Sequence, residues 1–241
     1  MSVAGGIRPA ARHRMRGKRC KPARLIQRPV PALYHGPVST APALDIGQVH
    51  RLSTDEYHRL IEAGGFGEDA RVELIDGLLA DMSPKTPAHE NAIAWLADWL
   101  TDAVDRGRHQ VRVGSPLTLE GSEPEPDLAV IAHDAPRPYH PATAALVIEV
   151  SVSSLQRDLV RKPSLYAAAG VGEYWVIDLD GRRAVIHRDP CSDGYADVAE
   201  VQAEGALAPT GLNIGAVSLA DLLRAATSSP GTRGRSGDPE S

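Results

Sequence analysis

Two apolar runs that each carry one carboxylate constrain the fold of this chain more than any other feature. Asp127 leads the first run, residues 127–132, and Glu149 lies inside the second, residues 144–150. Both runs are continuous in apolar residues, which is typical of strands that are buried on both faces of a sheet. If the two strands are antiparallel neighbours, the start of the first meets the end of the second, and both carboxylates lie at one sheet edge. Two buried negative charges are costly unless a cation or a proton neutralises them.

The rest of the pattern predicts an α/β fold, a mixed β-sheet flanked by helices, with an N-terminal helix plus β-hairpin before it. Ser53 and Glu56 have capping-box spacing at the start of that helix, whose predicted apolar face is Tyr57, Leu60 and Ile61. An Asp-Gly pair predicts the turn of a hairpin. The hairpin covers residues 71–82; further helices are expected at 88–106, 162–169 and 219–225, and further strands at 110–113, 173–178 and 183–188.

Charge is distributed unevenly along the 241 residues. Residues 1–44 contain nine Lys or Arg and no Asp or Glu; because the whole chain carries −5, the remainder carries −14. We interpret residues 1–45 as a disordered basic arm, either an unstructured extension or an electrostatic arm for nucleic acid, and residues 227–241 as a disordered tail. A strongly acidic domain binds phosphate backbones poorly, which counts against a nuclease.

The cysteines and the hydropathy indicate the compartment. Cys20 and Cys191 are the only cysteines. Their dissimilar contexts argue against a disulfide framework and against a cysteine zinc site, and they fit a reducing cytoplasm. No run approaches the roughly 20 apolar residues of a membrane helix, and the basic N-terminus lacks the apolar stretch of a secretory signal. We therefore expect a cytoplasmic protein that does not associate with a membrane.

Asp127, Glu149 and Lys162 are the first candidates for chemistry. Mg²⁺ prefers oxygen ligands and keeps several waters, so two or three carboxylates with open positions suit it. Two of the three have a plainer explanation: Asp127 as a turn residue, and Lys162 as the helix-surface partner of Asp158, four residues earlier. Glu149 is harder to explain without a partner or a metal.

Glu73 and His89 are further candidates. Glu73 lies in an alternating strand and points away from Val72 and Leu74, either to solvent or to the same site. His89 and Glu90 begin a helix, where Glu90 fits an acid facing the helix dipole and His89 is a candidate proton carrier or metal ligand. The sequence contains no Gly-x-Ser-x-Gly, Walker or dinucleotide glycine motif, and we reject those chemistries.

The candidates belong to a set of short motifs that together resemble one family. The set comprises Val72-Glu73-Leu74-Ile75-Asp76-Gly77, Met82-Ser83-Pro84 followed by His89, Glu125-Pro126-Asp127-Leu128-Ala129, Val147-Ile148-Glu149-Val150-Ser151 with Ser153-Ser154, Asp158 and Lys162, and Leu165-Tyr166-Ala167 through Ala169-Gly170-Val171 to Glu173-Tyr174-Trp175. Over roughly residues 50–225 the chain is similar to the Uma-type restriction endonuclease family, within the PD-(D/E)XK nuclease superfamily.

The resemblance implies a restriction-endonuclease-like domain, which we place at residues 46–226. It assigns Asp127 and Glu149 to the two acidic positions of the superfamily. The usual lysine lies two residues after the second acid, where this chain has Ser151, so the resemblance points to Lys162 in the following helix instead.

The activity that the resemblance implies is that of a Mg²⁺-dependent DNA endonuclease. Asp127 and Glu149, with Glu73 or a backbone carbonyl, are expected to hold Mg²⁺, and Lys162 to orient or help deprotonate the attacking water. Glu73 and His89 match family markers. A homodimer is also expected, because cleavage of a duplex needs two cuts.

Two other hypotheses stay open at this point. The first is a catalytically silent nuclease-fold protein that serves as a nucleic-acid or protein interaction module, which the charge of −14 favours. The second is an enzyme that uses the same site on another phosphorylated substrate.

Overall fold

The computed structural model describes residues 49–67, 70–135 and 140–228 of the chain. The predicted basic arm, residues 1–45, lies outside these residues, as does the predicted tail beyond Ser228. A six-stranded sheet forms the centre of the molecule, in the order β3-β4-β5-β6-β7-β8. Its strands are β3 (His109–Val113), β4 (Leu128–Ala132), β5 (Leu146–Ser151), β6 (Glu173–Asp178), β7 (Arg183–Cys191) and β8 (Gly194–Gln202).

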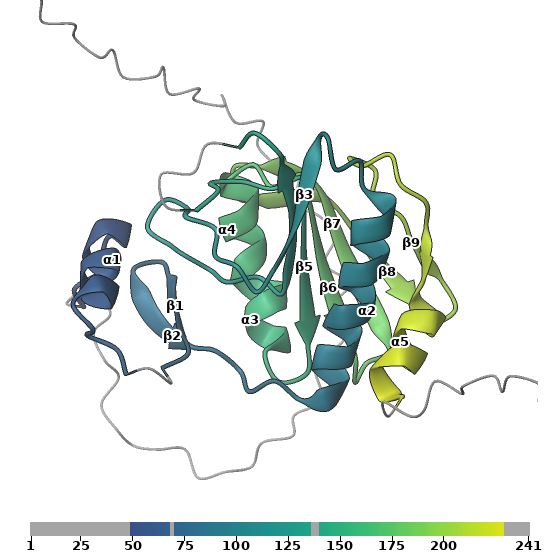
Figure 1. Cartoon of the computed structure of the whole chain (residues 1–241), viewed down its shortest axis with the longest axis horizontal. Coiled ribbons are helices and arrows are strands. Elements are labelled where there is room, and N and C mark those ends of the chain that lie inside the picture. Colours follow the sequence, from purple (N-terminus) through teal and green to yellow (C-terminus); the bar gives the residue numbers. More distant parts are fainter. Residues whose placement is uncertain (1–48, 68–69, 136–139, 229–241) are drawn as a thin grey trace, which may run out of the picture.

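Helices cover both faces of this sheet, so the domain has three layers (Figure 1). Side chains from β4 and β5 alternate between the two cores: Val130 and Ile148 pack with α2 and α5, whereas Ala129 and Val147 pack with α3 and α4. Both strands are therefore buried on both faces, as the continuous apolar runs predicted. The helices are α2 (Pro87–Ala103), α3 (Leu155–Val160), α4 (Lys162–Ala168) and α5 (Leu219–Thr227).

The sheet is mixed. β5 and β6 are parallel, and every other pair of neighbours in it is antiparallel. Parallel neighbours need a crossover, which α3 and α4 supply. The predicted fold class, a mixed sheet flanked by helices, is confirmed. A short pair, β9 (Ala206–Leu207) and β10 (Val217–Ser218), precedes α5.

The N-terminal helix and hairpin also form as predicted. α1 (Thr54–Glu62) begins with the capping box of Ser53 and Glu56. The hairpin pairs β1 (Val72–Ile75) with β2 (Leu78–Asp81). Asp76 and Gly77 both have positive φ, 50° and 76°, which is the conformation of a type I′ turn.

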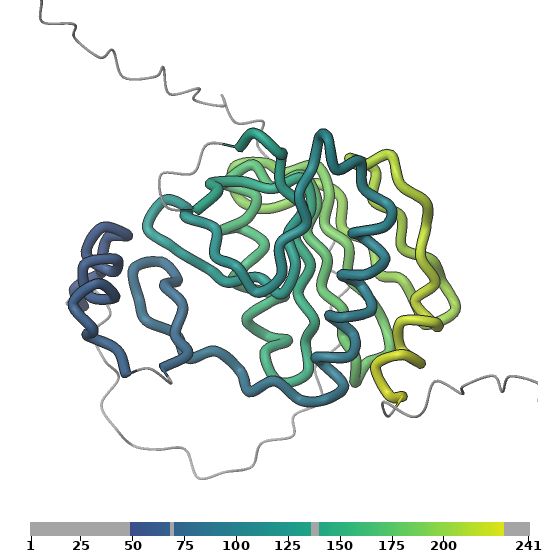
Figure 2. Tube along the Cα trace, viewed as in Figure 1, coloured from purple at the N-terminus to yellow at the C-terminus, as the bar shows by residue number. Residues whose placement is uncertain are grey.

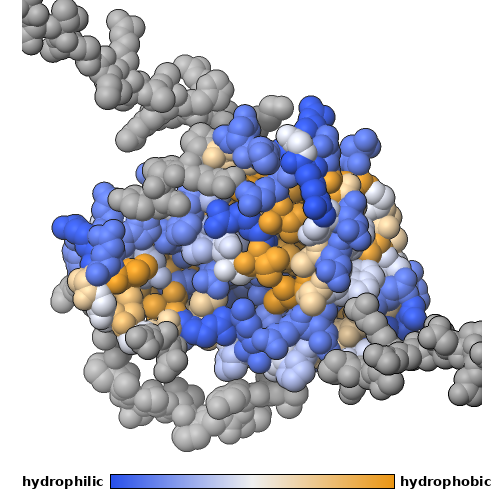
Figure 3. Space-filling model, viewed as in Figure 1, coloured by the Kyte–Doolittle hydropathy of each residue, from blue (hydrophilic) through white to orange (hydrophobic). Residues whose placement is uncertain are grey.

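One expectation about side chains is wrong. Leu60 and Ile61 are 38% and 48% exposed; of the predicted apolar face only Tyr57 is buried, because α1 lies at the margin of the domain and not over a core. Figure 3 shows apolar surface over α1 and the hairpin. Cys20 lies outside the described residues, so the expectation of reduced cysteines stays a prediction.

Three boundaries also differ from the sequence pattern. α3 was not predicted as a separate helix, β7 continues to Cys191, and α5 continues to Thr227, the first residue of the predicted tail. Figure 2 shows the connection from β2 to α2, residues 82–86, passing along the lower edge of the molecule to the end of the sheet where β5 finishes. Within the part that the structure describes, no helix is long and apolar enough to span a membrane.

Candidate active site

The register of β4 and β5 brings Asp127 and Glu149 to one edge of the sheet. The strands are antiparallel and Leu128 lies opposite Ile148, so Asp127, one residue earlier, arrives beside Glu149, one residue later. The backbone N–H of Val150 donates a 2.8 Å hydrogen bond to Oδ2 of Asp127. The start of one strand thus meets the end of the other, as expected for antiparallel neighbours.

Glu149 is buried and hydrogen-bonded through one oxygen. Its Oε1 lies 2.8 Å from Nζ of Lys162 and accepts a 3.0 Å hydrogen bond from the hydroxyl of Tyr166. Burial raises the pKa of Glu149 well above its usual value, and the ammonium of Lys162 opposes that rise. A carboxylate in this position needs the lysine as a partner, because an unpaired buried charge is strongly unfavourable.

Lys162 lies at the centre of a carboxylate cluster. Besides Glu149, its Nζ lies 3.5 Å from Glu73 and 3.6 Å from Asp158, and only 5% of its side chain is exposed. Burial alone lowers the pKa of Lys162, but the three carboxylates outweigh burial, and the net pKa is raised. Lys162 is therefore charged at neutral pH. The plainer explanation, a helix-surface pair with Asp158, is wrong, because both side chains are buried.

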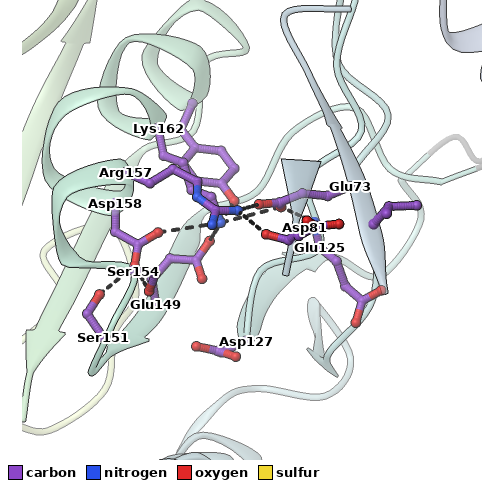
Figure 4. Close-up of polar contacts among 12 residues, drawn as sticks. Glu73, Asp81, Glu125, Asp127, Glu149, Ser151, Ser154, Arg157, Asp158 and Lys162 are labelled. Carbon is purple, nitrogen blue, oxygen red and sulfur yellow. Dashed lines mark hydrogen bonds and ion pairs between the residues drawn. The ribbon is translucent and has the colours of Figure 1, made fainter. Parts of the chain in front are cut away.

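Asp158 is held in place by two serines. The hydroxyls of Ser151, at the end of β5, and Ser154, just before α3, each lie 2.5 Å from Oδ2 of Asp158. Tyr174 adds a hydrogen bond to the backbone carbonyl of Asp158, at 2.8 Å. These contacts fix α3 against the sheet, and α3 in turn places Asp158 beside Lys162 (Figure 4).

Glu73 points into the same site from β1. Its Oε1 lies 3.0 Å from Nη1 of Arg157, and its Oε2 accepts a 3.3 Å hydrogen bond from the N–H of Glu125. Arg157 also donates to the carbonyl of Asp81 at 2.8 Å, so it connects α3 to both strands of the hairpin. Both oxygens of Glu73 are therefore occupied by donors, and Glu73 does not point to solvent (Figure 4).

His89 lies on the other side of Asp127. It occupies the first turn of α2, after the N-cap Thr86. Its Nε2 lies 3.2 Å from Oδ2 of Asp127. Its Nδ1 is buried, and no hydrogen-bond partner for it exists among the described residues. All five residues that the sequence singled out, Glu73, His89, Asp127, Glu149 and Lys162, line one pocket.

The pocket has a volume of about 50 Å³, and both acids and bases line it. A water needs roughly 10–15 Å³ of such space, so the pocket has room for an ion together with one or more waters. Four basic side chains line it as well, Arg71, Lys85, Arg157 and Lys162. Burial raises the pKa of Glu125, which lies between the N-terminal hairpin and Asp127.

The donor set fits a hard divalent cation. Within the described part of the chain, Oδ1 of Asp127 and Oε2 of Glu149 have no hydrogen-bond partner, whereas the second oxygen of each carboxylate is fixed by the contacts above. Two carboxylate oxygens with room for water are a typical Mg²⁺ environment.

Sequence reasoning missed Arg157, Tyr166 and the basic residues Arg71 and Lys85. Arg157 and Tyr166 lie within the stretch that carries the motifs, but their contacts with Glu73 and Glu149 are tertiary. Arg157 had one usable signal, its position one residue before Asp158 in a segment that follows a strand.

Comparisons with known proteins agree with this fold. A family model described as "Uma2: Putative restriction endonuclease" matches residues 54–220. The crystal structure of a "putative nuclease belonging to DUF820 from Anabaena variabilis ATCC 29413" superposes with a TM-score of 0.60 at 14% sequence identity, covering 73% of this chain and 99% of that one. At that identity the likeness shows a shared fold. A comparison with curated proteins found no match.

Proposed function

The chain belongs to the Uma2 family, whose description is "Putative restriction endonuclease", and from that premise we propose that it is a Mg²⁺-dependent DNA endonuclease. The substrate bond is a phosphodiester, which a metal-activated water hydrolyses. One observation carries the proposal. Asp127 and Glu149 meet at one sheet edge, where β4 and β5 pair, and Lys162 at the start of α4 donates a hydrogen bond to Glu149.

Asp127 and Glu149 are the residues that we assign to the metal. In each carboxylate one oxygen accepts a hydrogen bond, from the N–H of Val150 or from Nζ of Lys162, and the other oxygen can bind an ion. Mg²⁺, when bound there, supplies a Lewis acid that polarises the phosphate and stabilises the leaving oxygen. The backbone N–H of Val150 and the hydroxyl of Tyr166 hold the two carboxylates in place, so little reorganisation is needed on binding.

Lys162 and Arg157 are the cations that we assign to the phosphate. Lys162 is charged, so in this proposal it orients the attacking water and offsets the charge of the phosphate, and it does not remove the proton. Arg157 lines the pocket with 28% of its side chain exposed, and it can add a second contact to a phosphate oxygen.

Glu73 and His89 take positioning roles in this proposal. Glu73 holds Arg157 and Lys162 through its two oxygens, and direct ligation of Mg²⁺ by Glu73 stays a prediction. His89 contacts Asp127 through Nε2 while its other nitrogen is buried, so we assign it to orienting Asp127, and its role as a proton carrier is untested.

The acidity of the chain bears on DNA binding. The net charge of −14 beyond residue 44 disfavours non-specific affinity for phosphates. Arg71 and Lys85 are exposed and line the pocket together with Arg157, so basic side chains are available where the scissile phosphate would bind. We further propose that residues 46–226 form the nuclease domain, that the active form is a homodimer, and that the protein acts in the cytoplasm.

A metal titration tests the proposal against a catalytically silent module. Purified chain freed of metal is titrated with Mg²⁺ by calorimetry, alongside Asp127→Asn, Glu149→Gln and the control Asp98→Asn, an exposed carboxylate on α2. We expect binding by the wild type and by Asp98→Asn, and a loss of at least about tenfold in the two site variants. Absence of binding to the wild type would support the silent module.

DNA must then be distinguished from other phosphorylated substrates. Cleavage of plasmid DNA is measured beside hydrolysis of a small phosphodiester and a phosphomonoester under the same Mg²⁺ concentration. Cleavage of the plasmid alone supports the endonuclease. Hydrolysis of the small substrates without cleavage of the plasmid supports the alternative enzyme with the same site.

A further inference from the structure

A second group of potential metal ligands lies outside the candidate active site. His58 comes from α1, Glu123 from the segment before β4, and His140 from the segment before β5, and their ligand atoms all lie within 4.8 Å of one another. Nε2 of His58 lies 2.7 and 2.8 Å from the two oxygens of Glu123, and Nε2 of His140 lies 3.9 Å from Oε1 of the same carboxylate. None of the three lines the pocket around Asp127.

The carboxylate at the centre of this group is almost fully buried. The side chain of Glu123 is 2% exposed, that of His58 10%, and that of His140 32%. Thr118 donates a 2.7 Å hydrogen bond to Oε2 of Glu123. Among the described residues the ion pairs of Glu123 involve the two histidines and no Lys or Arg. A buried carboxylate in this setting needs positive charge, which either a protonated histidine or a metal ion can supply.

The ligand types and their spacing suit Zn²⁺. Two imidazoles and one carboxylate are a common zinc donor set, with a water in the fourth position. Bonds of about 2.0–2.2 Å in a tetrahedron put neighbouring ligand atoms about 3.3–3.6 Å apart. The nitrogens lie 2.7 to 3.9 Å from the oxygens of Glu123, and all three ligand atoms lie within 4.8 Å of one another, so side-chain shifts of about 1 Å would close the site. The partly exposed His140 leaves the site open to water.

We propose that His58, Glu123 and His140 bind one Zn²⁺ ion, which fastens α1 to the domain. Tyr57 is the buried apolar residue of α1, whereas Leu60 and Ile61 are exposed, so apolar packing attaches this helix only weakly. The ion would join α1 to two segments that are 65 and 82 positions later in the chain, and cross-links between distant segments stabilise a fold most. This inference does not depend on the proposed nuclease activity.

The site also lies next to the strand that carries Glu73. Glu123 pairs with Leu74 through two backbone hydrogen bonds, Leu74 N–H to Glu123 at 3.4 Å and Glu123 N–H to Leu74 at 2.7 Å. An ion that fixes Glu123 would therefore also fix β1. Glu73, which contacts Arg157 and Lys162, is the neighbour of Leu74 in this strand. A zinc ion bound there would therefore also steady one wall of the pocket.

The test is zinc binding by the full chain after removal of metal with a chelator. Zn²⁺ is titrated by calorimetry into the wild type, His140→Gln, Asp127→Asn/Glu149→Gln and the control His50→Gln, whose side chain is 77% exposed. We expect one equivalent in the wild type, in His50→Gln and in the double variant, and at least a tenfold weaker affinity in His140→Gln. Zn²⁺ should also raise the melting temperature of the wild type but not that of His140→Gln.

His140 is the safest residue to change, because it is the most exposed of the three, and circular dichroism verifies that the variant is folded. His58→Gln repeats the test from α1. The proposal is overturned if the wild type binds no Zn²⁺, because the contact between His58 and Glu123 would then be an ordinary hydrogen bond. It is equally overturned if zinc binding is lost in Asp127→Asn/Glu149→Gln and kept in His140→Gln, because the ion would then occupy the other site.

Discussion

Lys162 and Glu149 form a buried ion pair, with Nζ of the lysine 2.8 Å from Oε1 of the glutamate. The two residues are 13 positions apart, one at the end of β5 and the other at the start of α4, so the pair fastens the crossover to the strand. Breaking such a pair leaves an uncompensated charge in the interior. The pair is therefore both a structural contact and the centre of the proposed chemistry.

Replacing Lys162 tests this dual role. We expect Lys162→Met to lower the free energy of unfolding by about 3–5 kcal/mol, because Glu149 loses its buried partner. The double variant Glu149→Gln/Lys162→Met should lose less free energy of unfolding than the two single variants lose together, by about 1 kcal/mol or more, because the residues are coupled. Urea denaturation measures both. A single variant as stable as the wild type, or strict additivity in the double variant, would show that the pair is not coupled as the geometry requires.

Tyr166 supplies the second hydrogen bond to Glu149. We expect Tyr166→Phe to lower stability by about 1.5–3 kcal/mol, since its acceptor is a carboxylate. Tyr195→Phe is the matched control: its hydroxyl donates to the neutral carbonyl of Val171, at the same distance of 3.0 Å, and should cost about 0.5–1.5 kcal/mol. Equal losses in the two variants would indicate that Glu149 is protonated in the folded protein.

The hairpin turn that positions β1 makes a backbone prediction. Gly77 has φ of +76°, and a Cβ there would lie 2.6 Å from Cβ of Arg51, so Gly77→Ala should destabilise the protein by more than about 1 kcal/mol. Gly67→Ala is the control, because no atom lies within 4 Å of its Cβ position. Thermal denaturation compares the two. A melting temperature for Gly77→Ala equal to that of the control would contradict the turn geometry.

His187 predicts how stability depends on pH. Burial between Tyr174 and Tyr195 lowers its pKa below the usual 6.5, while a hydrogen bond to the carbonyl of Tyr174 opposes this. The unfolded chain therefore binds more protons just below pH 6.5, and stability falls as the pH drops through that value. Between about pH 7 and pH 5.5, His187→Gln should therefore lose less stability than the wild type, because it lacks the contribution of His187. Identical urea midpoint profiles for the two proteins would contradict the assignment.

The strands and their acids could be read from the sequence for a simple reason. An apolar run such as that from Leu146 to Ile148 is typical of a strand buried on both faces of a sheet. When two such strands pair antiparallel, Asp127 and Glu149 come to lie at the same sheet edge. The lysine followed from the resemblance, and the structure places it within hydrogen-bonding distance of Glu149. Each of these inferences used information within one segment or one pair of neighbours.

Other features depend on contacts that no local pattern encodes. Arg157 meets Glu73 across 84 positions of the chain, and His58 meets Glu123 across 65. The exposure of Leu60 and Ile61 follows from where α1 is placed, although its apolar spacing is that of a buried face. Tertiary placement decided these features, and for that reason the sequence led to wrong or missing expectations there.

Cleavage of supercoiled plasmid by the purified chain tests the central claim most directly. The wild type and the control Asp98→Asn should nick or linearise the plasmid in Mg²⁺, and a chelator should stop them. Asp127→Asn should lower the rate by at least about a hundredfold, because the metal would lose a carboxylate ligand. If the folded wild type cuts no DNA with Mg²⁺ or Mn²⁺, or if Asp127→Asn cuts as fast as the wild type, the account of this site as a metal-dependent nuclease is contradicted.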